Sequence, residues 1–345
     1  MKSEHYTSLE NSLSRSGFLE TRHGKLHLPS VIPVLKPVKF DKYWFTLLKE
    51  KLTDAFMINA SILLNSPIIE EVLKKGIHSY LNYEGVVFCD SGGYSKFSRD
   101  IQQDKLLDVQ LRLGVDIITT LDYPTQLSKT WVRRDMIRKS VDNALIAGEN
   151  IDDEKNVLIF ASVHGPSSNE IKNTITFLER YSSFDGYAVG SLLSIKSDYK
   201  RIVDLIIAAR RATNKHLHAY GIVGSATYPL MFYLGVDSVD SQGTLLSGGT
   251  RHFYVPGKTD IHYKKLEMSQ WSCPCKVCTN QVAQNLSLRE KIALHNFLTV
   301  QREVKLIQRL IMEGSYEEYL KDRFATSTVL KRAFKYASRK IKRIL

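Results

Sequence analysis

The stretch GVVFCDSGGY at residues 85–94 shows the pattern on which the chain is built: a β-type apolar run ends in a cluster of Asp, Ser and Gly residues. Short runs of this kind, bounded by turn-forming residues, are typical of buried strands. This run and seven similar ones cover residues 27–35, 55–60, 85–90, 115–122, 157–165, 186–192, 216–224 and 236–243. The sequence therefore predicts eight strands.

Amphipathic segments fill most of the intervals between these runs. Apolar residues recur at i, i+3 or i+4, and i+7 in residues 67–75, 104–113, 132–147, 168–181, 197–212 and 227–234, which predicts helices. Alternating strands and helices are typical of an α/β fold, either a (β/α)8 TIM barrel or an open doubly wound sheet. No glycine-rich dinucleotide or P-loop motif follows a predicted strand, so we favour the barrel.

Composition and charge restrict the class of protein. The 345 residues are 43% hydrophobic and 24% charged, which excludes collagenous and low-complexity chains. We expect a cytoplasmic protein with no membrane partner, because the sequence shows neither a signal peptide nor the roughly 18 apolar residues of a membrane span. The net charge is +12, and residues 321–345 hold nine Lys and Arg against Asp322 alone. Such a segment indicates a polyanionic partner or a solvated tail.

Carboxylates stand at the ends of several predicted strands. Asp90 and Asp122 end two of the runs, and Asp237 and Asp240 lie together in another. On a barrel, catalytic groups gather at the carboxyl ends of the strands, so we expect these four side chains to converge. Converging carboxylates suit glycosidic chemistry or divalent cations. A single Asp before Gly is more often a turn residue.

Three of the four cysteines lie within six positions, in CPCKVC at residues 273–278. This spacing favours a zinc site over buried free thiols or a disulfide framework. His295 lies in an apolar helical segment, where a core histidine is the alternative to a fourth ligand. His252 and His262 are the other candidates for that ligand.

Together these motifs resemble the tRNA-guanine transglycosylase superfamily, the queuine and archaeosine tRNA-ribosyltransferases. Residues 90–94 (DSGGY) are similar to its DSGGF signature, and residues 184–192 (FDGYAVGSL) to its FDGYAIGGL. Residues 220–224 (YGIVG) and 235–240 (GVDSVD) resemble its MGVG and GVDMFD. Cys273, Cys275 and Cys278 match its CxCxxC zinc ligands, and His295 with Asn296 resembles its HN pair. The resemblance covers about residues 20–312.

The resemblance implies a TIM barrel that carries structural Zn2+ and exchanges guanine in a nucleic acid for a 7-deazaguanine base such as preQ0. It makes Asp240 the nucleophile at C1′ and Asp90 the acid and base. A carboxylate nucleophile divides one difficult substitution into two displacements and retains the sugar configuration. The residues expected to bind the base are Asp122, Tyr94, His164, Gly190, Ser191 and Tyr220.

Three departures from the family pattern concern the substrate. His164 stands where the family has a Gln that reads the base, and Ser191 replaces a Gly. The loop that engages tRNA is replaced by residues 242–251, which end in Arg251. DpdA-type DNA transglycosylases, a branch of the superfamily, keep the barrel and the zinc site but act on DNA. We therefore expect guanine exchange in DNA, with tRNA as the alternative and a non-catalytic nucleic-acid-binding subunit as a second alternative.

The basic segment 321–345 is expected to form an amphipathic helix. Leu330, Phe334, Ala337, Ile341 and Leu345 recur at helical spacing, so one face is apolar and the other basic. The basic face could contact phosphate, a membrane surface or water, and nucleic acid is the first choice. With Arg251, the residues expected to bind nucleic acid are Lys331, Arg332, Lys335, Arg339 and Lys340.

The expected organisation is one barrel domain over residues 1–345. It includes a zinc-binding subdomain over 271–312, inserted after the last strand, and the helical basic C-terminus. A homodimer and partner proteins of a DNA-modification system are compatible with this interpretation.

Overall fold

The computed structural model describes residues 4–8, 12–37, 41–95, 101–125, 130–150, 156–222, 224, 226–256, 260–267, 272–282 and 285–345. Val223, in the expected strand 216–224, and residues 271 and 283–284, in the expected zinc-binding segment, lie outside them. Among the described residues, no helix is both long and apolar enough to cross a membrane.

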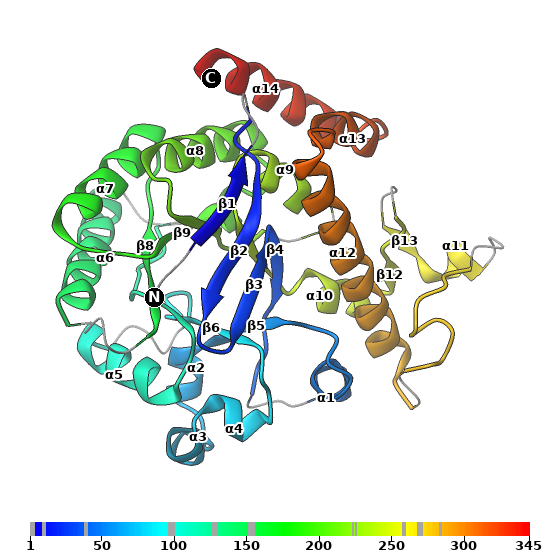
Figure 1. Ribbon diagram of the computed structural model, residues 1–345, viewed down its shortest axis with the longest axis horizontal. Helices are drawn as coiled ribbons and strands as arrows, with labels where there is room; N and C mark the ends of the chain where they lie inside the picture. The colour runs from blue at the N-terminus through cyan, green and yellow to red at the C-terminus, as the bar shows by residue number, and fades with distance from the viewer. Residues whose placement is uncertain are drawn as a thin grey trace.

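Eight parallel strands form the barrel at the centre of the molecule (Figure 1). Their order in the sheet is β4-β11-β10-β9-β8-β7-β6-β5. The strands are β4 (Ser30–Pro33), β5 (Ala55–Asn59), β6 (Val86–Asp90), β7 (Ile117–Thr119), β8 (Leu158–Val163), β9 (Gly186–Val189), β10 (His216–Ala219) and β11 (Ser238–Ser241). Each lies within one of the eight predicted runs.

One backbone bridge distinguishes a barrel from an open sheet. Val34, just after β4, forms a parallel bridge with Met57 of β5, and the Leu35 N–H donates to the Met57 carbonyl at 2.7 Å. The first and last strands of the sheet therefore meet, and the predicted (β/α)8 barrel is confirmed.

Helices surround the strands, and all six predicted helical segments are present. The helices are α1 (Lys42–Lys49), α2 (Ala60–Leu64), α3 (Ile69–Lys75), α4 (Ile77–Leu81), α5 (Gln103–Leu113), α6 (Thr130–Asn150), α7 (Ser168–Tyr181), η3 (Leu192–Ile195, 3-10), α8 (Tyr199–Ala212), α9 (Tyr228–Tyr233), α10 (Gly243–Gly249), α11 (Tyr263–Glu267), α12 (Leu288–Met312), α13 (Tyr316–Arg323) and α14 (Thr328–Ile344). Local sequence sets their ends. At α12, for example, Ser287 and Glu290 form a capping box that satisfies free backbone N–H groups.

A small antiparallel sheet covers the amino-terminal end of the barrel. It consists of β1 (Glu4–Ser8), β2 (Arg15–Thr21) and β3 (Gly24–Leu28). Leu19, Leu26 and Leu28 pack with Phe88 and Phe160 of the barrel strands in one buried cluster. The predicted run 27–35 thus divides into the end of β3 and strand β4, because its first residues belong to this sheet.

The C-terminal helices lie outside the barrel. Helix α12 packs along α10, and α14 packs against α8 (Figure 1). A second two-stranded sheet, β12 (His252–Phe253) with β13 (Ile261–His262), lies beside α12.

Candidate functional site

A cavity of about 340 Å³ opens at the carboxyl ends of the barrel strands. Asp90 ends β6, Asp240 lies near the end of β11, and Asp122 follows β7. The cavity also lies against the loops after β9 and β10. Its lining includes Asn59, Asp90, Gly93, Tyr94, Asp122, Gly190, Ser191, Tyr220, Gly221, Asp240 and Gln242. Every residue expected to act in catalysis or to bind the base lines this cavity, except His164.

Asp90 is held by a neighbouring strand end. The Asn59 Nδ2 amide donates to Asp90 Oδ2 at 3.0 Å. Burial, reinforced by the negative charge of Asp122, raises the pKa of Asp90 to about 7. A carboxyl group with a pKa near neutrality can both give and take a proton.

Asp240 is aligned by a backbone amide. The Gly221 N–H, in the loop after β10, donates to Asp240 Oδ1 at 2.7 Å. Burial raises the pKa of Asp240 to about 6, so the group is mostly a carboxylate at neutral pH. An anionic oxygen at the edge of the cavity is available as a nucleophile.

A hydrogen-bond chain joins the two positions that depart from the family pattern. His164 Nε2 lies 2.8 Å from Asp122 Oδ2, and His164 Nδ1 lies 2.9 Å from Ser191 Oγ. Ser191 Oγ in turn accepts from the Thr125 backbone N–H at 3.1 Å. One proton assignment satisfies the chain: Ser191 donates to Nδ1, and the Nε2–H faces the Asp122 carboxylate.

His164 therefore lies behind Asp122. Its side chain is buried and is absent from the described lining of the cavity. The sequence predicts that this imidazole reads the base edge, whereas the structure places it where it orients Asp122. Ser91 Oγ donates to the other Asp122 oxygen at 2.8 Å. Asp122 also lines the cavity.

The two glycines of the DSGG motif allow close packing beneath the cavity. Gly92 has φ +87°, a left-handed conformation that favours glycine. A Cβ on Gly93 would collide with Asp122, so this position also excludes a side chain. The two tyrosines that line the cavity are held differently. Tyr94 is 53% exposed to solvent. Tyr220 is fixed by its hydroxyl, which donates to Thr119 Oγ1 at 3.1 Å.

Asp237 does not join the other three carboxylates. It precedes β11 and lies at the amino-terminal end of the barrel, fully buried. Arg15 donates to both of its oxygens, at 2.6 and 2.5 Å, and Arg210 donates to Oδ2 at 3.2 Å. The expectation that all four carboxylates converge is wrong here, because the chain crosses the whole barrel between Asp237 and Asp240.

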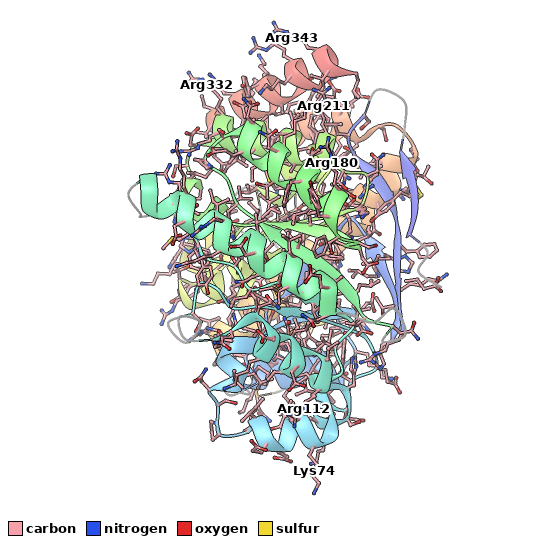
Figure 2. The ribbon with its side chains drawn as sticks, turned by 90° about the vertical axis from the view of Figure 1, so that its left-hand side faces the viewer. Lys74, Arg112, Arg180, Arg211, Arg332 and Arg343 are labelled. Carbon is pink, nitrogen blue, oxygen red and sulfur yellow. The ribbon has the colours of Figure 1, made fainter. Side chains whose placement is uncertain are left out.

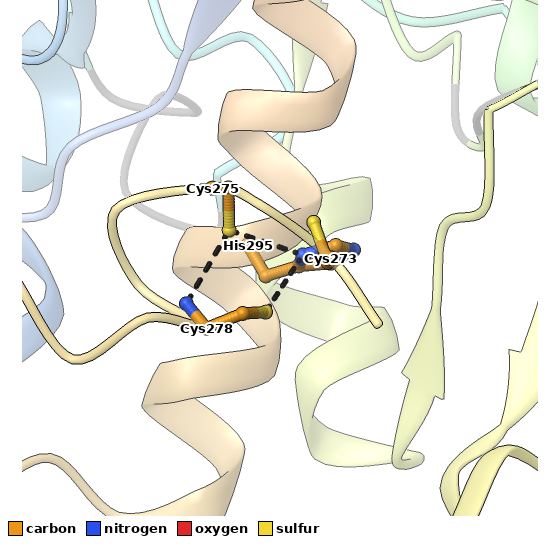
Figure 3. A group of neighbouring side chains, drawn as sticks. All are labelled: Cys273, Cys275, Cys278 and His295. Carbon is orange, nitrogen blue, oxygen red and sulfur yellow. Dashed lines mark hydrogen bonds between the residues drawn. The ribbon is translucent and has the colours of Figure 1, made fainter. Parts of the chain in front are cut away.

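Cys273, Cys275, Cys278 and His295 meet beside α12 (Figure 3). Their ligand atoms all lie within 4.8 Å of one another. His295 Nδ1 is 3.5 Å from Cys275 Sγ and 3.4 Å from Cys278 Sγ, while Nε2 lies 3.0 Å from the Tyr254 carbonyl. A carbonyl only accepts, so the proton is on Nε2 and the Nδ1 lone pair points at the thiols. Three thiolates and this imidazole fit a tetrahedral Zn2+ site.

The alternative zinc ligands lie elsewhere. His252 and His262 are paired across the β12–β13 ladder, and His252 Nδ1 is 3.2 Å from Thr250 Oγ1. Asn296 holds this strand to α12: its side chain accepts from the Tyr254 N–H at 2.8 Å and donates to the His252 carbonyl at 2.9 Å. Asn296 thus supports the cysteine cluster without being part of it.

The basic C-terminal segment 321–345 is not one helix: residues 321–323 end α13, and residues 328–344 form α14. The apolar face of α14 packs inward. Leu330, Phe334 and Ile341 are buried, whereas Leu345, at the end of the predicted stripe, is 55% exposed. Lys340 forms an ion pair with Asp204 of α8. The α14 helix lies on the outer layer of helices, and Arg332 and Arg343 extend from its surface (Figure 2).

The other expected phosphate ligands are also at the surface. Lys331, Lys335 and Arg339 of α14 are exposed. Arg251 is exposed in the turn after α10, with its guanidinium carbon 5.5 Å from the centroid of the Tyr263 ring. Nucleic-acid binding by these residues stays a prediction.

Sequence reasoning missed three groups that hold the carboxylates: Asn59, Ser91 and the Gly221 amide. Asn59 was detectable, because it is a polar residue at the end of a predicted strand. Ser91 lies inside the quoted DSGG motif. The Gly221 N–H is a backbone group, and only the tertiary structure brings it to Asp240.

The comparisons with known proteins agree with this geometry. The family model described as queuine tRNA-ribosyltransferase matches residues 10–328. A tRNA-guanine(15) transglycosylase from Methanococcus aeolicus is 24% identical over 353 residues, which cover 95% of this chain and 53% of that protein. The protein of the same name from Pyrococcus furiosus is 26% identical over 346 residues, covering 94% and 57%. That from Sulfolobus acidocaldarius is 25% identical over 334 residues, covering 91% and 65%.

The chain spans little more than half the length of the first two of these relatives. The family model, in contrast, covers most of the chain, including the strand ends that carry Asp90, Asp122 and Asp240, the cysteine cluster and α12. With the barrel and these side chains in place, the chain belongs to the queuine tRNA-ribosyltransferase family.

Proposed function

We propose that the protein exchanges bases in tRNA: a guanine leaves its ribose and a 7-deazaguanine base takes its place. The observation that carries this proposal is the presence of Asp90 and Asp240 at one cavity of about 340 Å³, within a barrel of this family. The relatives are tRNA-guanine(15) transglycosylases, which favours tRNA over the DNA substrate expected from the sequence.

The two carboxyl groups suit two successive displacements. An Asp240 oxygen attacks C1′, the bond from C1′ to the guanine nitrogen breaks, and Asp90 gives its proton to the leaving base. The incoming base then gives a proton to Asp90, its nitrogen attacks C1′, and the bond to Asp240 breaks. Both carboxyl groups return to their starting protonation states, and two inversions retain the configuration at C1′.

The base would pack against Tyr94 and Tyr220, with its polar edge toward Asp122. A guanine presents amide and amino N–H groups along one edge, and a carboxylate accepts from both. Asp122, oriented by Ser91 and His164, presents such an acceptor to the cavity. Tyr94 and Tyr220 line the same space and can pack against a flat ring.

An exchange assay with labelled guanine tests this function, with bulk tRNA and duplex DNA in parallel. We expect incorporation into tRNA by the wild type, and loss of activity by roughly 10⁴-fold or more in Asp240→Asn, whose amide is not a nucleophile. Denaturing gels should show a covalent adduct with nucleic acid for the wild type only. Asp108→Asn, at an exposed site on α5, is the matched control and should keep full activity.

The possible results of this assay test different parts of the proposed function. Incorporation into DNA alone would return the assignment to a DNA transglycosylase. An adduct that persists in Asp240→Asn would assign the nucleophile to another residue. A folded wild type that exchanges neither polymer would favour the non-catalytic binding subunit.

We further propose that the cysteine cluster binds a structural Zn2+. Cys273, Cys275, Cys278 and His295 would hold the ion, which would join the loop at residues 272–282 to α12. Cys275→Ser should lose this zinc and lower the melting temperature, since a structural zinc contributes directly to folding. A folded, active preparation in which Co2+ produces no thiolate charge-transfer band would contradict this proposal.

A further inference from the structure

Tyr220 carries a hydroxyl group that packing against a base does not use. Tyr220 follows β10, and its hydroxyl donates to Thr119 Oγ1, at the end of β7, at 3.1 Å. Strands β9 and β8 lie between β10 and β7 in the sheet, so this side chain reaches across the mouth of the barrel. The family motif MGVG begins with Met where this chain has Tyr220, so the hydroxyl is not part of that motif.

Thr119 holds this hydroxyl beside Asp90. Cys89 pairs with Ile118 in the parallel register of β6 and β7. Asp90 and Thr119 follow these two residues, so their side chains point to the same face of the sheet. Thr119 Oγ1 also accepts from the Ser91 N–H, directly after Asp90, at 3.0 Å. The Tyr220 hydroxyl is thus tied to the strand end that carries the proposed acid and base.

We propose that the Tyr220 hydroxyl donates a hydrogen bond to Asp90 when that group is a carboxylate, and so positions it between its two proton transfers. This inference rests on the proposed function, in which Asp90 gives a proton to the leaving guanine and later takes one from the incoming base. While Asp90 is protonated, the Tyr220 O–H points at Thr119. Once Asp90 is ionised, the Tyr220 proton turns to the carboxylate, and the Thr119 hydroxyl donates to the Tyr220 oxygen in its place.

The electrostatics around Asp90 favour such a donor. Burial and the charge of Asp122 raise the pKa of Asp90 to about 7, with a smaller contribution from Asp240. The Gly92 backbone and the Tyr220 hydroxyl act in the opposite direction and lower it. Burial, followed by the charge of Asp90, raises the pKa of Tyr220 well above its ordinary value, so the hydroxyl keeps its proton near neutral pH.

The other titratable groups nearby leave this role to the hydroxyl. His218 packs edge-on against the Tyr220 ring, with centroids 4.6 Å apart, and burial holds its pKa well below the ordinary value, so it is neutral. His164 faces Asp122, at 2.8 Å. The described lining of the cavity holds one cationic side chain, Lys36, which is exposed to solvent.

NMR titration of the aspartate carboxyl carbons tests the contact in the full-length protein without substrate, with the Asp90 signal assigned from Asp90→Asn. Tyr220→Phe keeps the ring and removes the hydroxyl. We expect the pKa of Asp90 to rise by about one pH unit, because a hydrogen bond to the charged form is lost. Tyr220→Met, with the residue of the family motif, should give the same change. Tyr181→Phe, at a 66% exposed site on α7, is the matched control and should leave the pKa unchanged.

The pH dependence of exchange tests the role in the reaction. In Tyr220→Phe, the fall of the single-turnover rate at alkaline pH should move up by about one pH unit, because Asp90 keeps its proton longer. At about pH 6 the rate should be roughly threefold lower, since a weaker acid protonates the leaving base less readily. A merely structural hydroxyl would instead change the rate by the same factor at every pH.

Two results would overturn this inference: an unchanged pKa of Asp90 in Tyr220→Phe, or an exchange rate that falls equally at every pH. A wild type that exchanges bases in neither tRNA nor DNA would overturn the proposed function instead. In that case the NMR titration would still decide whether the Tyr220 hydroxyl binds the Asp90 carboxylate.

Discussion

Asp237 and Asp240 stand at opposite ends of β11, and their surroundings differ as much as their positions. At the amino-terminal end, burial alone would raise the pKa of Asp237, but Arg15 and Arg210 hold it below its ordinary value. At the cavity, burial raises the pKa of Asp240 to about 6, with the Gly221 amide as the main opposing contact. The comparison teaches that burial acts alike on both carboxyl groups. Adjacent cations hold Asp237 as a buried anion, whereas Asp240 has no such cation beside it among the described residues and, in the proposed function, is the reactive group.

The largest effect is expected when one of the two arginines that hold Asp237 is removed. Arg210→Ala should lower the free energy of unfolding by about 3–5 kcal/mol, because Asp237 stays buried with one fewer cation. Arg210 also donates to the Thr213, Lys215 and Gly235 carbonyls, which would lose a donor. Denaturant unfolding measures the change.

Arg211→Ala is the matched control for this substitution. Arg211 is the next residue of α8 and extends outward at the surface (Figure 2), so its loss should change stability by at most about 0.5 kcal/mol. Equal changes in the free energy of unfolding for the two substitutions would show that the contacts of Arg210 with Asp237 do not stabilise the fold.

The second test concerns the reactive end. If Asp240 must be ionised and Asp90 protonated, exchange should be fastest between about pH 6 and 7. Above this range, the rate should fall by about tenfold for each pH unit, because the proton on Asp90 is lost. Single-turnover rates with saturating tRNA measure this profile. A rate that stays constant up to pH 9 would remove Asp90 from the role of acid.

The third test compares the effect on stability of replacing a carboxylate by an amide at each end of the barrel. The folded-state pKa of Asp90 lies above its ordinary value, so its contribution to stability is present at about pH 4 and lost as the pH rises through 7. Asp90→Asn should therefore be more stable than the wild type by about 1–2 kcal/mol at pH 8. Near pH 4 the two proteins should be equal.

Asp237→Asn should do the opposite at pH 8 and destabilise the protein, because it removes the anion between two buried guanidinium groups. Denaturant unfolding at both pH values provides the comparison. Loss of stability in both variants at pH 8 would contradict the distinction between the two ends.

The smallest effect is expected where a carboxylate and its cation are both near solvent. Lys340 and Asp204 join α14 to α8 with side chains that are 37% and 27% exposed. Lys340→Ala should therefore change stability by less than about 1 kcal/mol, and the change should shrink further as salt is added. Thermal melting at low and high salt measures it. A loss as large as that of Arg210→Ala would mean that burial does not set the strength of these pairs.

Much of the barrel could be predicted from the sequence, because each strand and helix leaves a local periodic pattern. The small sheet over the barrel could not. Leu19, Leu26 and Leu28 look like the residues of any short strand, and only their packing against Phe88 and Phe160 shows which surface they cover. The bridge from Val34 to Met57, which closes the barrel, is also a contact between distant residues.

For the candidate site, the sequence by itself determined which residues we predict to carry the chemistry: the DSGG segment, Asp240, Asp122, the three cysteines and His295. Residue type, spacing and the family resemblance led to this prediction, since these side chains offer functional groups that few other residues supply. The tertiary structure alone decided their partners. It brought His164 to Ser191, turned Asp237 to the opposite end of the barrel, and placed the Tyr220 hydroxyl at Thr119. Partners depend on contacts between residues far apart in the chain, and no local pattern records such contacts.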